Sequence, residues 1–146
     1  KETTDKCIKL EFPENLSKVH FIKMTLTEDG KVVSDNFYHR SLEENNYQDL
    51  CQLAKVALQS ATTVDKNADG TWSAVSVIEN KTSTPALMIR LNVVDGKDDQ
   101  QILPVFYSDN YFSLLPGEKK EVRMSWRDED TRGNEGKVLI TGYNVE

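Results

Sequence analysis

The sequence has few of the residues on which catalytic and metal sites are commonly built. It contains two cysteines and two histidines, and these four residues show no zinc-site spacing. It also lacks a glycine-rich phosphate loop and a Gly-x-Ser-x-Gly nucleophile turn. Cys7 and Cys51 are too few for a disulfide framework, so we expect two buried thiols, with one bridge as the alternative. We therefore expect no cofactor and no catalytic residue in this chain, and we expect His20 and His39 at a surface or a sheet edge.

Long apolar runs and clusters of basic residues are absent as well. No apolar segment approaches the roughly 20 residues of a membrane-spanning helix. The first four residues are polar and do not resemble a signal peptide, which suggests a piece of a longer polypeptide. The net charge is −6, and the 18 basic residues are scattered along the chain. Because phosphate binding needs clustered lysine and arginine, we expect neither nucleic acid nor a membrane surface as a partner.

What the sequence does contain is a series of short strand patterns separated by turns. Residues 119–127 illustrate the alternation, since Val122, Met124 and Trp126 fall on one face of the predicted strand. Residues 41–54 differ and predict a loop with one or two helical turns. Strands are predicted at residues 6–12, 19–27, 31–38, 56–65, 71–79, 87–93, 102–107, 111–115, 119–127 and 137–145.

These patterns fall into two groups. Residues 55–146 supply seven or so strands, close to the about seven of an immunoglobulin-like sandwich. Residues 1–54 supply about three, which is near the minimum for an independently stable sheet. The sequence therefore predicts an all-β chain. An immunoglobulin-like antiparallel β-sandwich over residues 55–146 is preceded by a partial immunoglobulin-like domain, its C-terminal strands only, plus a linker over residues 1–54.

The most informative segment is residues 102–118, ILPVFYSDNYFSLLPGE. It predicts two short strands joined by the turn Ser108-Asp109-Asn110, and Pro116-Gly117 ends the second strand. Pro104 cannot donate a ladder hydrogen bond, so the first of these strands is expected at a sheet edge or a bulge.

The same segment resembles the C-terminal immunoglobulin-like β-sandwich region of glycoside hydrolase family 2 enzymes of the β-mannosidase and exo-β-D-glucosaminidase type. The resemblance covers residues 55–146 well and residues 19–53 more loosely. It extends to Asn80, to Arg90-Leu91 and to Gly142-Tyr143-Asn144.

The resemblance implies a non-catalytic accessory role beside the catalytic barrel of a parent enzyme. Family 2 enzymes are similar to one another in placing both catalytic glutamates in a (β/α)₈ barrel, which takes about 250 residues, and this chain has no room for one. We therefore expect no hydrolysis by this chain alone and a partner in that barrel. By analogy, the location is periplasmic or secreted.

Two alternatives remain open at this stage. A carbohydrate-binding module that takes β-linked oligosaccharides would need exposed aromatic side chains, for which Trp72, Tyr111 and Tyr143 qualify by type, whereas Trp126 is expected in the core. A protein-interaction or adhesion sandwich would need an open edge strand or a large apolar patch. The candidate residues for a glycan or interdomain contact are Trp72, Tyr107, Asp109, Asn110 and Tyr111.

Two short motifs have simpler interpretations. Asp65, Asn67 and Asp69 match the start of a calcium loop, but Ser76 stands where the bidentate glutamate belongs. A hairpin turn is therefore favoured there, and no metal is expected. Asn15 and Asn80 each begin an N-glycosylation pattern, and chance easily produces two.

Overall fold

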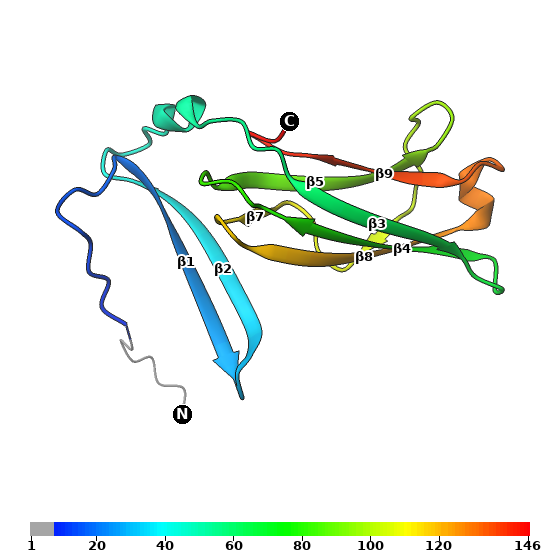
Figure 1. The fold of residues 1–146 in the computed structure, drawn as a ribbon, viewed down its shortest axis with the longest axis horizontal. Coiled ribbons are helices and arrows are strands. Elements are labelled where there is room, and N and C mark those ends of the chain that lie inside the picture. The colour runs from blue at the N-terminus through cyan, green and yellow to red at the C-terminus, as the bar shows by residue number, and fades with distance from the viewer. Residues whose placement is uncertain (1–7) are drawn as a thin grey trace. The chain divides into compact units, whose positions relative to one another are not determined.

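The computed structural model describes residues 8–146 and consists of antiparallel sheets with two short 3-10 helices (Figure 1). The chain divides into two compact units, Lys1–Gln52 and Leu53–Glu146. In the described part, neither helical segment has the length and apolarity needed to cross a membrane.

The first unit contains one hairpin, formed by β1 (Val19–Glu28) and β2 (Lys31–Ser41). Asp29 and Gly30 connect the strands, and both have positive φ values, as the tightest hairpin turns require. His20 and His39 lie on this hairpin, half-buried against aromatic rings. The helix η1 (Gln48–Gln52) follows, which confirms a helical turn in the loop predicted at 41–54.

The prediction of a strand at residues 6–12 is wrong for residues 8–12, which are the part of it that the structure describes. Residues 8–12 form no strand, and Ile8, Leu10 and Phe12 are exposed. Alternation alone did not suffice, because a strand also needs a hydrogen-bonding neighbour and residues 8–12 pair with neither β1 nor β2. Lys6 and Cys7 lie outside the described residues. The partial sandwich over residues 1–54 therefore stays a prediction.

The second unit is a two-layered antiparallel sandwich, as predicted (Figure 1). One layer has the strand order β3–β4–β8–β6 and the other the order β7–β5–β9. The helix η2 (Asp128–Thr131) joins β8 to β9. The strands are β3 (Gln59–Lys66), β4 (Thr71–Glu79), β5 (Ala86–Asp95), β6 (Phe106–Tyr107), β7 (Phe112–Leu114), β8 (Lys119–Arg127) and β9 (Gly136–Thr141).

The core lies between these two layers and is built mainly from alternate residues of β4, β5, β7 and β8. Trp126 is 2% exposed, which confirms its predicted core position. In β5 the alternation shifts at a bulge between Ala86 and Ile89, so Ala86 joins the core cluster and Met88 is exposed. Residues Val56, Ala74, Ile78, Ala86, Ile89, Leu91, Val93, Ile102, Phe112, Leu114, Val122, Met124 and Trp126 form the cluster.

The segment 102–118 supplies β6 and β7, each shorter than predicted. The peptide bond before Pro104 is cis, and β6 lies at the edge of its sheet, which confirms the predicted edge position. The prediction of buried thiols is wrong for Cys51, which is exposed. Cys7 lies outside the described residues, so the alternative of a bridge stays untested.

Candidate functional site

The turn at residues 108–111 is fastened to the edge of β5 by an asparagine side chain. Asn110 Oδ1 accepts a hydrogen bond from the Leu91 amide at 2.9 Å, and Asn110 Nδ2 donates to the Leu91 carbonyl at 3.0 Å. A side-chain amide thus takes the place of a strand neighbour at this position. The side-chain amide of Asn110 therefore serves to hold the turn against β5.

The Tyr107 side chain contacts the same edge of β5 two residues further along, at Val93. The Val93 amide donates a hydrogen bond to the Tyr107 hydroxyl at 3.2 Å. Burial raises the pKa of this hydroxyl, so it stays neutral. With the polar end of its ring engaged in this way, Tyr107 offers little to an incoming ligand.

Asp109 is also occupied by contacts within the domain. Its carboxylate forms an ion pair with Lys120 and accepts a hydrogen bond from the Asn110 amide at 2.7 Å. Lys120 Nζ in turn lies 4.8 Å from the centre of the Phe112 ring, within the range of a cation–π contact. Asp109 thereby joins the turn to β8.

Tyr111 is the candidate residue that the turn presents to solvent. Its side chain is 59% exposed, and its backbone has a φ of 58°, in the left-handed region that bulky residues avoid. The Arg90 guanidinium lies 5.9 Å from the centre of the Tyr111 ring. Of the five candidate residues, Tyr107, Asp109 and Asn110 hold the turn in place. Tyr111 is exposed on the turn, and Trp72 lies elsewhere, on β4.

Trp72 lies in a packed cluster at β4. Its ring stacks on Trp126 with centroids 6.4 Å apart and planes 2° from parallel. Its Nε1 donates to Asp128 Oδ1 at 2.7 Å, and Lys66 Nζ donates to Asp128 Oδ2 at 2.8 Å. Hydrogen bonds from Lys66 and then from Trp72 lower the pKa of Asp128. This geometry favours a structural role for Trp72 over a sugar-stacking platform.

The segment that resembles a calcium loop forms a tight hairpin connection between β3 and β4. Asp69 Oδ1 accepts hydrogen bonds from the Thr71 amide at 3.0 Å and from its hydroxyl at 2.6 Å. Asn67 Nδ2 donates to Thr71 Oγ1 at 2.9 Å, and Asp65 pairs with Ser73 in the ladder. Within residues 8–146, no three metal-ligating side chains of the His, Cys, Asp and Glu types converge.

The sequence predicted no structural role for two asparagines that prove to be buried, Asn80 and Asn144. Asn144 accepts from the Leu87 amide and donates to the carbonyls of Ala54 and Pro85. Asn80 is fully buried and donates to the carbonyls of Thr84 and Leu114, so its side chain is not open to a glycan in this fold. The resemblance contained both residues, but only the structure reveals their bonds.

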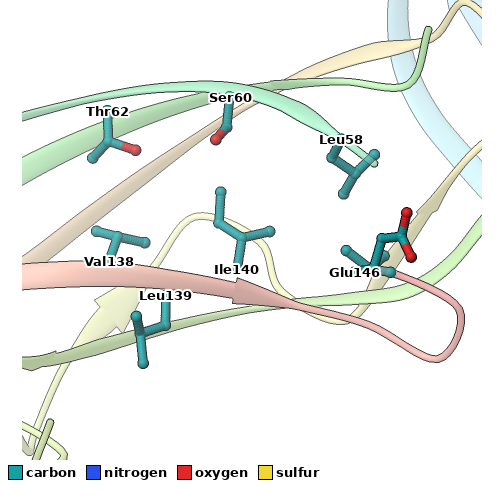
Figure 2. A pocket seen from close by; sticks show the side chains of 8 residues that line it. Leu58, Ser60, Thr62, Val138, Leu139, Ile140 and Glu146 are labelled. Carbon is teal, nitrogen blue, oxygen red and sulfur yellow. The ribbon is translucent and has the colours of Figure 1, made fainter. Parts of the chain in front are cut away.

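An open groove of about 270 Å³ lies between the edge strands β3 and β9 (Figure 2). Val138 and Ile140 of β9 point into it, whereas Leu139 points the opposite way. Its one acidic side chain is Glu146. Glycoside hydrolysis normally needs two carboxylates that flank the bond, so this groove does not have the composition of a glycosidase cleft.

The packing of a four-stranded on a three-stranded antiparallel sheet is the arrangement of an immunoglobulin-like β-sandwich domain. Residues 36–145 match the family described as the exo-β-D-glucosaminidase Ig-fold domain, and the chain belongs to that family. This confirms the resemblance to the immunoglobulin-like region of family 2 glycoside hydrolases.

Relatives of known name point the same way. The chain is 31% identical over 144 residues to the exo-β-D-glucosaminidase of Arthroderma benhamiae and 29% identical over 151 residues to that of Streptomyces avermitilis. These matches cover 88% and 89% of the chain but only 16% and 17% of the relatives. The chain thus spans about a sixth of their length.

A solved structure and a plant relative complete the comparison. The exo-chitosanase CsxA of Amycolatopsis orientalis is 28% identical, with a TM-score of 0.81 over 90% of this chain and 18% of that one. A shorter match joins 32% of this chain to the mannosylglycoprotein endo-β-mannosidase of Lilium longiflorum, at 47% identity over 47 residues.

Proposed function

We propose that this chain is a non-catalytic accessory region of a family 2 glycoside hydrolase and that it supports a catalytic barrel elsewhere in the same polypeptide. The observation that carries this proposal is membership of the Ig-fold family over residues 36–145, in a chain that matches about a sixth of its relatives. The groove composition agrees, because it offers no pair of carboxylates for hydrolysis.

The parent enzyme is proposed to be of the exo-β-D-glucosaminidase type. Matches to glucosaminidases cover 88–90% of this chain, whereas the mannosidase match covers 32%. The proposed partner is the parent's barrel, and the proposed location is periplasmic or secreted.

Sugar release from defined oligosaccharides tests this proposal. The full polypeptide and the isolated chain are incubated separately with chitosan oligosaccharides and with β-mannan oligosaccharides. We expect glucosamine from chitosan with the full polypeptide and no product with the isolated chain. Hydrolysis by the isolated chain would overturn the accessory role, and mannose release alone would overturn the substrate type.

A carbohydrate-binding module is the second candidate, and the exposed ring of Tyr111 is the observation that favours it. Stacking of a sugar on this ring would give a saturable signal when the isolated chain is titrated with oligosaccharide, and the Tyr111→Ala variant would lose it. A flat titration would remove this candidate.

A further inference from the structure

Two residues of the second unit hold unfavourable backbone conformations and expose apolar side chains. Met88 has a φ of 51° and Tyr111 a φ of 58°; among the described residues, the other non-glycine residues with positive φ are Asp, Asn or Arg. Met88 is 50% exposed and Tyr111 59% exposed. Left-handed conformations are costly for residues with large side chains, and such strain tends to persist at functional sites.

Local hydrogen bonds hold both conformations in place. The Met88 amide donates to Ser113 Oγ at 3.2 Å, at the bulge where β5 passes β7. The Tyr111 amide donates to Asn110 Oδ1 at 3.0 Å, and Asn110 is itself bonded to Leu91. Neither exposed side chain contributes to the core cluster, so burial in the core does not account for the strain.

Both residues border one surface, the outer side of the β7–β5–β9 sheet. Arg90 connects them, since it lies on β5 two residues from Met88 and its guanidinium reaches the Tyr111 ring. Leu139 of β9 points away from the groove (Figure 2). In the ladder between β5 and β9 it pairs with Asn92, on the outer side of the sheet. We call this surface the Tyr111 face; its residues are Met88, Arg90, Asn92, Tyr111, Ser113, Leu139 and Thr141.

The Tyr111 face is cationic and apolar. The outward positions of β5, β7 and β9 carry no carboxylate, and Arg90 is the charged residue of the face; Lys137, at the start of β9, is ion-paired with Asp99. In the part of the chain that the structure describes, Arg90 has no ion-pair partner. Tyrosine, arginine and methionine are the types enriched at protein interfaces. This composition fits a protein surface that is apolar and supplies a carboxylate.

We propose that the Tyr111 face docks onto the catalytic domain of the same polypeptide, with Arg90 bound to a carboxylate of that domain. This inference rests on the proposed accessory role. Chitosan fits the face poorly, because its protonated amino groups would meet Arg90. A second copy fits poorly too, because a two-fold contact through this face would bring arginines together without an acid.

Hydroxyl-radical footprinting of the isolated chain and of the full polypeptide tests the docking without any substitution. In the isolated chain, Met88 and Tyr111 are oxidised readily, while buried Met124 is protected. In the full polypeptide we expect oxidation of Met88 and Tyr111 to be at least about tenfold slower, since an interface core is packed like a protein interior. Phe106, 68% exposed on the other sheet, serves as the control whose rate stays the same.

Equal oxidation rates in both contexts would overturn the proposal. Protection of the isolated chain by added chitosan oligosaccharide would overturn it as well, in favour of a glycan platform. The readout does not depend on activity, so a polypeptide without glucosaminidase activity would refute the proposed function and leave the docking test intact.

The Tyr111→Gly variant gives a second test, because it should affect the melting temperatures of the isolated chain and of the full polypeptide differently. Tyr111→Gly relieves the left-handed strain, so the isolated chain keeps or raises its melting temperature. In the full polypeptide the same variant removes the contact and lowers the melting temperature, and Arg90→Glu does so too. Arg123→Glu, on β8, is the charge control; because it breaks the ion pair with Glu121, its effect on the isolated chain is subtracted from its effect on the full polypeptide. An unchanged melting temperature of the full polypeptide with both Tyr111→Gly and Arg90→Glu would contradict the proposal.

Discussion

At the scale of single residues, side chains complete the edge of β5 where its neighbour β7 ends. β7 pairs with Ala86 and Ile89, and beyond it the amides of Leu91 and Val93 donate to Asn110 and Tyr107. Unsatisfied backbone groups are costly in a partly buried position, so these two side chains have a clear energetic role.

Replacing Asn110 with alanine removes this substitute for a strand neighbour. Both the amide and the carbonyl of Leu91 lose a partner, and we expect a loss of unfolding free energy of about 1–3 kcal/mol. Urea unfolding of the isolated chain measures it. Asn92→Ala, on the outer side of the same strand, is the control and should stay within about 0.5 kcal/mol. Equal effects of the two substitutions would refute the role given to Asn110.

Asp128 should make the stability depend on pH in the acidic range. Hydrogen bonds from Lys66 and then from Trp72 lower its pKa, so its contribution is complete above the unfolded value of about 3.9 and disappears as pH falls through the lower folded value. Wild type should therefore lose more stability than Asp128→Asn between pH 7 and pH 3. Urea unfolding followed by tryptophan fluorescence measures both. The same loss in both proteins would mean that Asp128 is not responsible.

Residue types predicted the core better than they predicted the site. Trp126 could be assigned to the core because it is in phase with Val122 and Met124. The contacts of Tyr107 and Asn110 could not be foreseen, because they join residues 14 and 19 positions apart whose neighbourhood only the fold creates. Met88 was not among the candidate residues for a related reason: no pattern in the sequence indicated the bulge between Ala86 and Ile89.

At the scale of elements, the strands differ in how well their neighbours support them. β4 lies between β3 and β8, and β5 between β7 and β9, whereas among the described residues β1 and β2 pair only with each other. The hairpin carries apolar residues on both faces, including Phe21 and Phe37 on one and exposed Leu26 on the other. A lone hairpin is marginally stable in water.

Hydrogen exchange should reveal this difference directly. Amides of β1 and β2 should exchange at least about 100-fold faster than those of β4, β5 and β8, because a hairpin without a core opens locally. Exchange of the isolated chain, read by mass spectrometry of peptides, measures this. Equal protection in the two groups would contradict the account of the hairpin as an incomplete sheet.

A core substitution in β8 should show which residues support the sandwich. Trp126→Ala should lower the unfolding free energy by about 3–5 kcal/mol, because it opens a cavity in the cluster between the sheets. Arg123→Ala on the same strand, with its exposed side chain, should cost at most about 0.5 kcal/mol. Chemical unfolding compares the two, and similar costs would refute the assignment of the two faces.

Alternation predicted β4 and β8 to the residue, because both have partners on each side. It was wrong at residues 8–12, where no neighbour is present, and too long at β6, where only Phe106 and Tyr107 pair with β8. In both cases the extent of the strand depends on hydrogen bonding to a neighbouring strand, and the periodicity of the sequence does not reveal that pairing.

At the scale of the whole molecule, the family membership and the composition of the groove are the two observations that bear on function. It belongs to the Ig-fold family of exo-β-D-glucosaminidases, and its described residues place no paired carboxylates in the groove. An accessory role predicts that the consequence of losing this region appears in the stability of the parent enzyme.

The most direct test is the thermal half-life of glucosaminidase activity in the full polypeptide and in a form that lacks the region of residues 55–146. We expect the shortened form to retain the catalytic residues but to lose activity markedly faster at elevated temperature. An unchanged half-life would contradict the proposal that this sandwich supports the catalytic barrel.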